Sequence, residues 1–233
     1  MKIALIGYGA MGKLIKTLAE NKNHEIAVVL DETAADISAQ ELADKLKGID
    51  AAIDFSVAEA VRRNVTACLI ANIPLVEGTT GWNSEKENVK KLVEEKNGAF
   101  VFGANFSIGV NLFYKITDYA SELFVKFEDY EAFIEEQHHS RKRDAPSGTA
   151  LKLKEIVAKN IKKDFSVSST RAGNIPGTHR VGFDGHADQI LLQHAARSRE
   201  GFASGALLAA EWIVGKKGFY EFTEVMDEIL QNG

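Results

Sequence analysis

The stretch Lys2-Ile3-Ala4-Leu5-Ile6-Gly7-Tyr8-Gly9-Ala10-Met11-Gly12 determines how the N-terminal half of this chain is interpreted. An apolar run of strand length leads into a G-x-G-x-x-G turn, and residues 11–20 then show helical apolar spacing. In such a turn Gly7 permits the sharp bend, Gly9 lets the backbone approach a pyrophosphate, and Gly12 lets helix and strand pack closely. The helix N-terminus offers N–H donors and partial positive charge to phosphates. The stretch therefore predicts a dinucleotide-binding turn formed by Gly7, Tyr8, Gly9, Ala10, Met11 and Gly12.

An acidic residue at the end of the next predicted strand supports this interpretation. Asp31 follows the last glycine by about the 20 residues at which the fingerprint places an acid for the ribose hydroxyls. The alternative is a tight turn of purely structural importance in an unrelated βα unit. Glu32 adds a second carboxylate, which would repel a 2′-phosphate. We therefore expect NADH or NADPH as cofactor, with NADH used at least as well.

Strand-length apolar runs alternate with helical patterns through the first part of the chain. The runs are Ile3–Ile6, Ile26–Leu30, Ala51–Phe55, Pro74–Glu77 and Ala99–Phe102. One intervening helix is expected over Val57–Ile70, opened by a capping box of Ser56 and Glu59. The crossover after Leu30 is short, with a weak helical pattern. This alternation predicts an α/β fold, a Rossmann-type doubly wound parallel sheet.

Two loops follow strands of this predicted sheet. They are Gly78-Thr79-Thr80-Gly81 and Gly103-Ala104-Asn105-Phe106. Ligands of such sheets bind outside the carboxyl ends of the strands, so Gly78, Thr79, Thr80 and Gly103, Ala104, Asn105, Phe106 are candidate cofactor contacts. Ordinary turn chemistry is the alternative, because Gly, Thr and Asn favour loops.

The pattern changes after about Asn105. A helix is predicted over Ile108–Phe124, with Leu112, Ile116, Tyr119 and Leu123 at core spacing. A strand (Tyr130–Gln137), a helix (Ser147–Ile161), antiparallel strands within Phe165–Ala196 with a hairpin at Asp184-Gly185, and helices Ala203–Val214 and Phe222–Leu230 follow. We expect residues 1–105, completed by 207–233, to form the dinucleotide-binding domain. Residues 106–206 would form an inserted α+β domain.

Composition excludes several classes of protein. Apolar residues make up 45% and charged residues 26% of the 233 residues, as in soluble globular proteins. The net charge of −5 gives no overall attraction to nucleic acid or anionic membranes. A single cysteine, Cys68, excludes an intramolecular disulfide and multi-cysteine metal sites. Without a signal peptide or membrane span in the pattern, we expect a cytoplasmic protein.

The densest chemistry lies in the loop between the predicted strand ending at Gln137 and the helix beginning near Ser147. It contains His138 and His139 followed by Arg141-Lys142-Arg143. Histidine titrates near neutrality, and a nearby ammonium can protonate or stabilise a developing anion. Ser147-Gly148-Thr149 opens the helix and offers N–H and hydroxyl groups to a carboxylate. These residues suit a small polyanionic substrate that must accept a proton.

Three other interpretations of this loop compete. Adjacent histidines could bind a metal, but no motif such as H-E-x-x-H accompanies them, and no metal is predicted. The basic run is too short, in an acidic chain, to favour nucleic acid. A solvated charged loop remains open. Elsewhere, His179, His186 and His194 are explained by cross-strand packing or polar pairing.

The pattern His138-His139-x-x-Lys142-x-Asp144-Ala145-Pro146-Ser147-Gly148-Thr149-Ala150 resembles the signature of the 4-hydroxy-tetrahydrodipicolinate (dihydrodipicolinate) reductase family. The resemblance continues through Gly7–Gly12, Asp54-Phe55-Ser56, Gly78-Thr79-Thr80-Gly81, Asn105-Phe106-Ser107-x-Gly109-Val110-Asn111 and Arg171-Ala172-Gly173. It implies a Rossmann domain, a substrate domain whose sheet builds a homotetramer, and reduction of a cyclic dicarboxylate with NADH or NADPH on the route to diaminopimelate and lysine. It also implies that His138 donates or accepts a proton, that Lys142 is a second donor, and that His139, Gly148 and Thr149 hold substrate carboxylates.

Two rival functions remain at this stage. One is a related dehydrogenase of another small carboxylate, such as an amino acid. The other is a nucleotide sensor without catalysis, which would need the glycine turn but not His138, Lys142 or the helix start at Ser147.

Overall fold

The computed structural model describes residues 1–34 and 36–232, and the chain forms two compact units. Unit 1 comprises Met1–Ser107 and the segment from Glu200 onward, and unit 2 comprises Ile108–Arg199. The second boundary precedes helix α7 (Glu200–Ile213), whereas residue 206, the boundary expected from sequence, lies inside that helix. Gly233, at the end of the segment expected to complete the first domain, lies outside the described residues.

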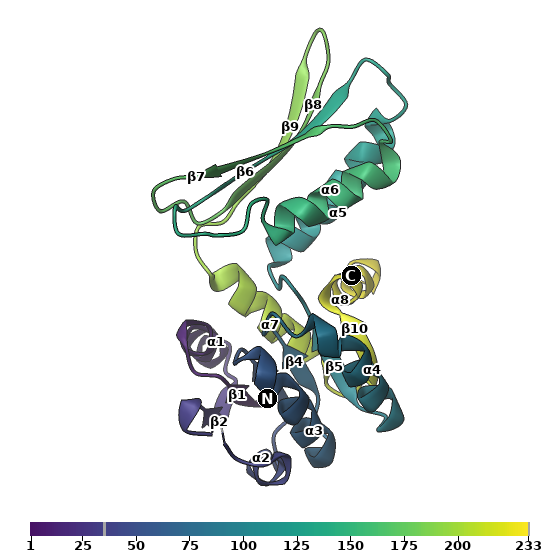
Figure 1. Cartoon of the computed structure of the whole chain (residues 1–233). Coiled ribbons are helices and arrows are strands. Elements are labelled where there is room, and N and C mark those ends of the chain that lie inside the picture. The colour runs from purple at the N-terminus through teal and green to yellow at the C-terminus, as the bar shows by residue number, and fades with distance from the viewer. Residues whose placement is uncertain (35, 233) are drawn as a thin grey trace. The chain divides into compact units, whose positions relative to one another are not determined.

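Unit 1 contains a six-stranded sheet in the order β10-β5-β4-β3-β1-β2, and every pairing in it is parallel. The strands are β1 (Lys2–Ile6), β2 (Glu25–Leu30), β3 (Ala51–Asp54), β4 (Leu75–Glu77), β5 (Ala99–Phe102) and β10 (Gly218–Glu221). The other helices of this unit are α1 (Ala10–Asn21), α2 (Ala39–Lys45), α3 (Val61–Ala71), α4 (Lys86–Glu95) and α8 (Phe222–Asn232). Helices α1 and α7 pack together on one face, and α2, α3 and α4 cover the other (Figure 1). The predicted doubly wound α/β fold is confirmed.

The apolar runs became strands because helices on both faces bury them completely. Ile3, Ala52 and Val76, from three neighbouring strands, are each 0% exposed. A parallel sheet buried on both faces needs continuous apolar runs instead of alternation, which is the pattern of the sequence.

The capping box expected at Ser56 and Glu59 is wrong. The Ser56 N–H donates to Asp54 Oδ1 (2.8 Å) and to Thr79 Oγ1 (3.0 Å), and α3 starts only at Val61, after a 3₁₀ turn. Ser56 therefore ties two strand ends together. A capping box instead opens α2, where Ser38 and Glu41 bond reciprocally.

Unit 2 contains a four-stranded sheet in the order β7-β6-β8-β9. Its elements are α5 (Ile108–Phe124), β6 (Glu131–His138), α6 (Gly148–Asn160), β7 (Ser166–Arg171), β8 (Thr178–Asp184) and β9 (Gln189–Ala195). Helices α5 and α6 lie against one face of this sheet (Figure 1). Strands β8 and β9 form the predicted antiparallel hairpin. Strand β7 does not follow the antiparallel prediction, because α6 returns the chain and β7 pairs parallel with β6.

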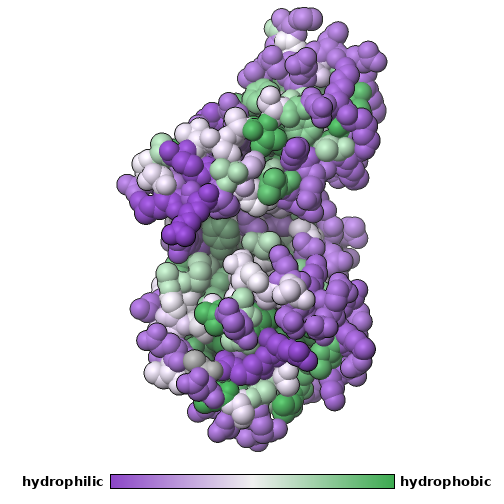
Figure 2. Space-filling model, viewed as in Figure 1, coloured by the Kyte–Doolittle hydropathy of each residue, from purple (hydrophilic) through white to green (hydrophobic). Residues whose placement is uncertain are grey.

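The core-facing side of α5 also differs from the prediction. Ile116, Tyr119 and Leu123 are 53%, 64% and 42% exposed. Figure 2 shows that hydrophobic residues also appear among the hydrophilic ones on the visible face of unit 2. The buried face instead contains Val110, Asn111, Phe113, Tyr114, Thr117 and Ser121. The helix carries two apolar stripes, and only contact with the sheet decides which of them is buried.

Candidate active site

A cavity of about 840 Å³ lies at the glycine turn of unit 1, and Gly7, Tyr8, Gly9, Lys13 and Asp31 are among its lining residues. A Cβ on Gly7 would lie 2.3 Å from the Phe55 carbonyl oxygen, whereas a Cβ on Gly9 would meet nothing within 4 Å. Gly9 therefore leaves open space beside the cavity. It also caps α1, which begins at Ala10, so the first N–H groups of the helix follow it directly. A dinucleotide pyrophosphate fits this arrangement.

Asp31 lies at the same cavity as an ionised carboxylate. Its Oδ1 accepts hydrogen bonds from Thr33 Oγ1 (2.6 Å) and the Thr33 N–H (3.0 Å). These bonds hold the pKa of Asp31 below its usual value. Glu32 and Lys13 also line the cavity, so both signs of charge are present.

Sequence reasoning missed Arg63 as a lining residue of this cavity. Arg63 lies on α3 and donates to the Ala34 carbonyl oxygen (3.1 Å) and to Asn64 Oδ1 (2.9 Å). It thus ties the crossover after Asp31 to α3. No local pattern marked it, because the Ala34 carbonyl that it binds lies 29 residues away in the sequence.

The two loops expected to contact cofactor follow β4 and β5, at the same sheet edge as the glycine turn. They do not line the 840 Å³ cavity, and neither do Ala10, Met11 and Gly12. Contacts nevertheless connect the loops to the segment after β3. Thr79 Oγ1 accepts from the Ser56 N–H, and the Phe106 ring lies 6.2 Å from the Phe55 ring.

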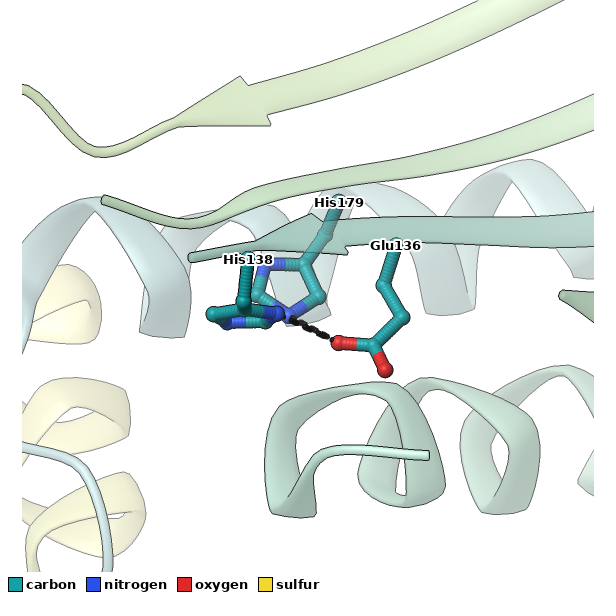
Figure 3. Close-up of side chains that lie close together, drawn as sticks. All are labelled: Glu136, His138 and His179. Atoms are coloured by element: carbon teal, nitrogen blue, oxygen red, sulfur yellow. Dashed lines mark ion pairs between the residues drawn. The ribbon is translucent and has the colours of Figure 1, made fainter. Parts of the chain in front are cut away.

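In unit 2 the candidate chemistry is concentrated where β6 ends. His138 and Glu136 lie two residues apart on the helix-covered face of β6, and His179 lies beside them on β8 (Figure 3). His138 Nδ1 is 2.7 Å from Glu136 Oε2, and the two imidazole rings are 5.1 Å apart. All three side chains are buried. Sequence reasoning selected His138 but gave Glu136 no role and assigned His179 to cross-strand packing or polar pairing.

Glu136 is an ionised carboxylate despite its burial. Burial raises its pKa, but hydrogen bonds from Ser169 Oγ (2.7 Å), Arg171 Nη2 (2.6 Å) and the Ser147 N–H (3.0 Å) outweigh this and lower it to about 2. The negative charge is therefore present throughout the physiological pH range.

The two histidines differ in their capacity to carry a proton. Burial, with the neighbouring His138 adding to it, lowers the pKa of His179 to about 4, so His179 is neutral near pH 7. Burial also lowers the pKa of His138, but the Glu136 carboxylate opposes that effect. Of the two, His138 is the group suited to exchange a proton.

Lys142 lies partly buried in the loop after His138, and its Nζ is 2.8 Å from Asp144 Oδ1. This contact lowers the pKa of Asp144. The Lys142 ammonium also acts on His138, whose pKa it helps to lower, which places the two groups within electrostatic reach. His139, the next residue along from His138, is partly buried.

Three residues at the start of α6, Ser147, Gly148 and Thr149, differ in burial. Ser147 is buried: its hydroxyl accepts from the Ala150 N–H (3.2 Å) and bonds His179 Nε2 (3.1 Å), while its N–H donates to Glu136. Ser147 is thus fully engaged within the protein. Gly148 is exposed, with nothing within 4 Å of a Cβ, and Thr149 is partly buried. We therefore keep Gly148 and Thr149, and not Ser147, as candidates for binding a carboxylate.

Glu136, His138 and His179 also have the donor spacing of a metal site, with their nearest ligand atoms within 4.8 Å of one another. Strand pairing supplies the carboxylate that no linear motif showed. However, the guanidinium of Arg171 already compensates Glu136 at 2.6 Å, and the Lys142 ammonium acts on the same cluster. Because a divalent cation would be repelled by these charges, we assign the cluster to proton chemistry.

Comparison with known proteins gives a consistent result over the whole chain. The family model "Dihydrodipicolinate reductase, N-terminus" matches residues 1–106, and "Dihydrodipicolinate reductase, C-terminus" matches residues 109–226. The 4-hydroxy-tetrahydrodipicolinate reductase of Christiangramia forsetii is 38% identical, with all of both chains covered. That of Archaeoglobus fulgidus is 35% identical, over 99% of this chain and 100% of its own.

Solved structures agree on the fold. A dipicolinate-bound dihydrodipicolinate reductase from Paenisporosarcina sp. TG-14 superposes with a TM-score of 0.80 at 23% identity, covering 97% of this chain and 99% of its own. A scyllo-inositol dehydrogenase from Lactobacillus casei, solved with NAD(H) and scyllo-inositol, gives a TM-score of 0.55 at 10% identity, over 100% and 89% of the two chains.

Proposed function

The chain belongs to the dihydrodipicolinate reductase family, and we propose that it reduces 4-hydroxy-tetrahydrodipicolinate to tetrahydrodipicolinate in diaminopimelate and lysine biosynthesis. The observation that carries the proposal is the pairing of His138 with the ionised Glu136 beside the open start of α6. These groups suit a dicarboxylate that accepts a proton. Full-length relatives with this name at 35–38% identity support the assignment.

The cofactor of this reaction is a nicotinamide dinucleotide, which supplies the hydride when bound. Gly7, Tyr8, Gly9, Ala10, Met11 and Gly12 would hold its pyrophosphate, and Asp31 its ribose hydroxyls. Gly78, Thr79, Thr80 and Gly103, Ala104, Asn105, Phe106 would hold its nicotinamide end. The open space at Gly9 and the hydrogen-bonded carboxylate of Asp31 support this assignment.

The residues that bind the substrate and transfer its proton lie in unit 2. His138 holds the proton destined for the ring carbon next to the site of hydride addition, and Lys142 is the second donor. The N–H groups and hydroxyl at Gly148 and Thr149, with His139, hold the substrate carboxylates. Glu136 remains ionised throughout.

We propose that NADH is used at least as well as NADPH. Asp31 and Glu32 place two carboxylates at the cavity, where a 2′-phosphate would be repelled. Lys13 and Arg63 line the same cavity and reduce this bias, so we expect a preference instead of exclusion.

We propose a cytoplasmic homotetramer. The unit 2 sheet has α5 and α6 on one face (Figure 1). Its other face presents Leu191, which is 46% exposed, along with Glu135 and Arg180. Such a face suits contact with further copies of the chain. Cys68 is buried as a free thiol, which suits a reducing compartment. No described helix is long and apolar enough to cross a membrane.

The test is oxidation of NADH on addition of the freshly formed condensation product of aspartate semialdehyde and pyruvate. Absorbance should fall with the complete mixture and remain constant when either precursor is omitted. Folded protein that leaves the absorbance unchanged with both NADH and NADPH would reject the proposal. If it still binds NADH, a sensor or a different dehydrogenase would be favoured.

A further inference from the structure

The two carboxylate oxygens of Glu136 have different partners. Oε1 accepts from three donors, supplied by Ser147, Ser169 and Arg171. Oε2 accepts from none of these and lies 2.7 Å from His138 Nδ1, while its next ring contact, His179 Nε2, is 3.9 Å away. One oxygen therefore anchors the side chain, and the other faces the histidine (Figure 3).

The anchoring comes from elements far apart in the sequence. Ser169 and Arg171 lie on β7, and Ser147 lies at the start of α6. Strand β6 itself is held between β7 and β8. The Glu136 side chain is 0% exposed, so bulk water does not compete for it. A carboxylate held this way keeps both its position and its charge.

A carboxylate oxygen repels a lone pair and attracts an N–H group, so the charge on Oε2 favours a proton on the ring nitrogen that faces it. The Nδ1–Oε2 contact is at ion-pair distance without the alignment of a hydrogen bond, which makes the attraction chiefly one of charge. The opposite ring nitrogen, Nε2, faces Gly177. A Cβ on Gly177 would lie 3.1 Å from Nε2, and the φ of +149° at this position also favours glycine.

We propose that Glu136 is a positioning residue that keeps a proton on His138 Nδ1 and leaves Nε2 as the nitrogen that gives and takes the catalytic proton. This inference rests on the proposed function, in which His138 is the proton donor. The role follows a general rule that the partner of one imidazole nitrogen decides the task of the other. In addition, the Glu136 charge counteracts the burial and the cations Lys142 and Arg171 that disfavour protonated His138.

The first experiment measures kcat/KM against pH for Glu136→Gln, which keeps the shape but removes the charge. His138 must be protonated to donate, so activity falls above its pKa. Losing the carboxylate should move this alkaline limb to lower pH by roughly 1–3 units, the usual effect of a nearby opposite charge. Each unit means an about tenfold loss of the protonated form above the limb. If a folded Glu136→Gln variant loses activity at the same alkaline pH as the wild type, the proposal is overturned.

Glu135→Gln is the matched control. Glu135 neighbours Glu136 on the same strand but contacts Arg180 at 3.4 Å and is partly exposed. Its loss should leave the pH profile where it is. A shift equal to that of Glu136→Gln would indicate a general charge effect and contradict a specific role for Glu136.

A second measurement needs no variant at Glu136 and no substrate. Nitrogen-15 NMR of the wild-type protein reports the protonation of each imidazole nitrogen, with His138 assigned by comparison with His138→Gln. Neutral His138 should carry its proton on Nδ1. A proton on Nε2 would overturn the proposal even if Glu136→Gln failed to fold. Because this readout is independent of turnover, failure of the proposed function would appear separately, as absence of NADH oxidation by the wild type.

Discussion

Asp54 and Glu77 lie opposite each other at the ends of the neighbouring parallel strands β3 and β4, and the carboxyl groups of both are fully buried. Burial raises the pKa of both groups, and the charge on Asp54 raises that of Glu77 further. The pair therefore favours a state in which one of the two carboxyl groups keeps its proton. Asp54 accepts from the Ser56 N–H and Glu77 from the Thr79 N–H (2.7 Å), so the pair holds both segments expected near the cofactor.

The raised pKa of Glu77 predicts a loss of stability with rising pH. The unfolded chain releases this proton near pH 4.5, whereas the folded chain keeps it, so the stabilisation is complete below that pH and is lost as the pH rises toward the folded-state pKa. Glu77→Gln cannot ionise. Its free energy of unfolding, measured in urea, should exceed that of the wild type at pH 8 by roughly 1 kcal/mol or more, and the gap should narrow toward pH 5. The exposed Glu59→Gln is the control, and parallel pH dependence of wild type and Glu77→Gln would contradict a raised pKa of Glu77 in the folded protein.

His138→Ala and Lys142→Ala should reduce kcat by ~10²–10⁴-fold, the usual contribution of positioned acid–base groups. NADH affinity, measured by fluorescence titration, should stay nearly unchanged because the glycine turn is intact. Arg143→Ala removes an exposed cation of the same loop and should have little effect. Full activity of Lys142→Ala would remove Lys142 from the mechanism.

Thr149→Val should mainly raise KM for the dicarboxylate. A hydroxyl bond to a charged group contributes roughly 1.5–3 kcal/mol, which corresponds to about ten- to a hundredfold in binding. His139→Ala should behave similarly, while Thr149→Ser keeps the hydroxyl and most of the affinity. Unchanged KM in both Thr149→Val and His139→Ala would place the carboxylate site elsewhere.

Gly9→Ala should separate cofactor binding from folding. Nothing lies within 4 Å of a Cβ at this position, so the thermal unfolding midpoint should match the wild type. NADH affinity should fall, because the methyl group occupies space needed for the pyrophosphate. Gly12→Ala is the contrasting variant, since its Cβ would lie 2.3 Å from the Gly7 carbonyl oxygen and should destabilise the fold. Wild-type NADH affinity in Gly9→Ala would argue against pyrophosphate binding at this turn.

Asp31→Ser should shift cofactor preference toward NADPH, by roughly fivefold as expected for an exposed charge contact. Removing the carboxylate removes its repulsion of the 2′-phosphate while Lys13 and Arg63 remain at the cavity. The measurement is the ratio of kcat/KM for the two cofactors at low salt. A wild-type preference for NADPH would mean that the cations dominate this cavity.

Several features of this protein follow from short stretches of sequence alone. The strand, glycine turn and helix at the N-terminus depend on residues within one short segment, so spacing sufficed to predict them. Helix α5 occupies the predicted residues Ile108–Phe124, because its period and length are local properties. His138 and Lys142 were also selected from sequence, since their residue types and spacing form a recognisable pattern.

Tertiary structure decided what depends on partners distant in the chain. The direction of β7 follows from the α6 crossover, and burial on α5 follows from which of two apolar stripes meets the sheet. No motif or spacing in the sequence indicated a role for Glu136. Its charge and role arise because strand pairing and the α6 start bring Arg171, Ser169 and Ser147 to one oxygen and leave the other for His138. Periodicity encodes which segments form helices and strands, but a buried charge is stabilised only by donors that the completed fold assembles around it.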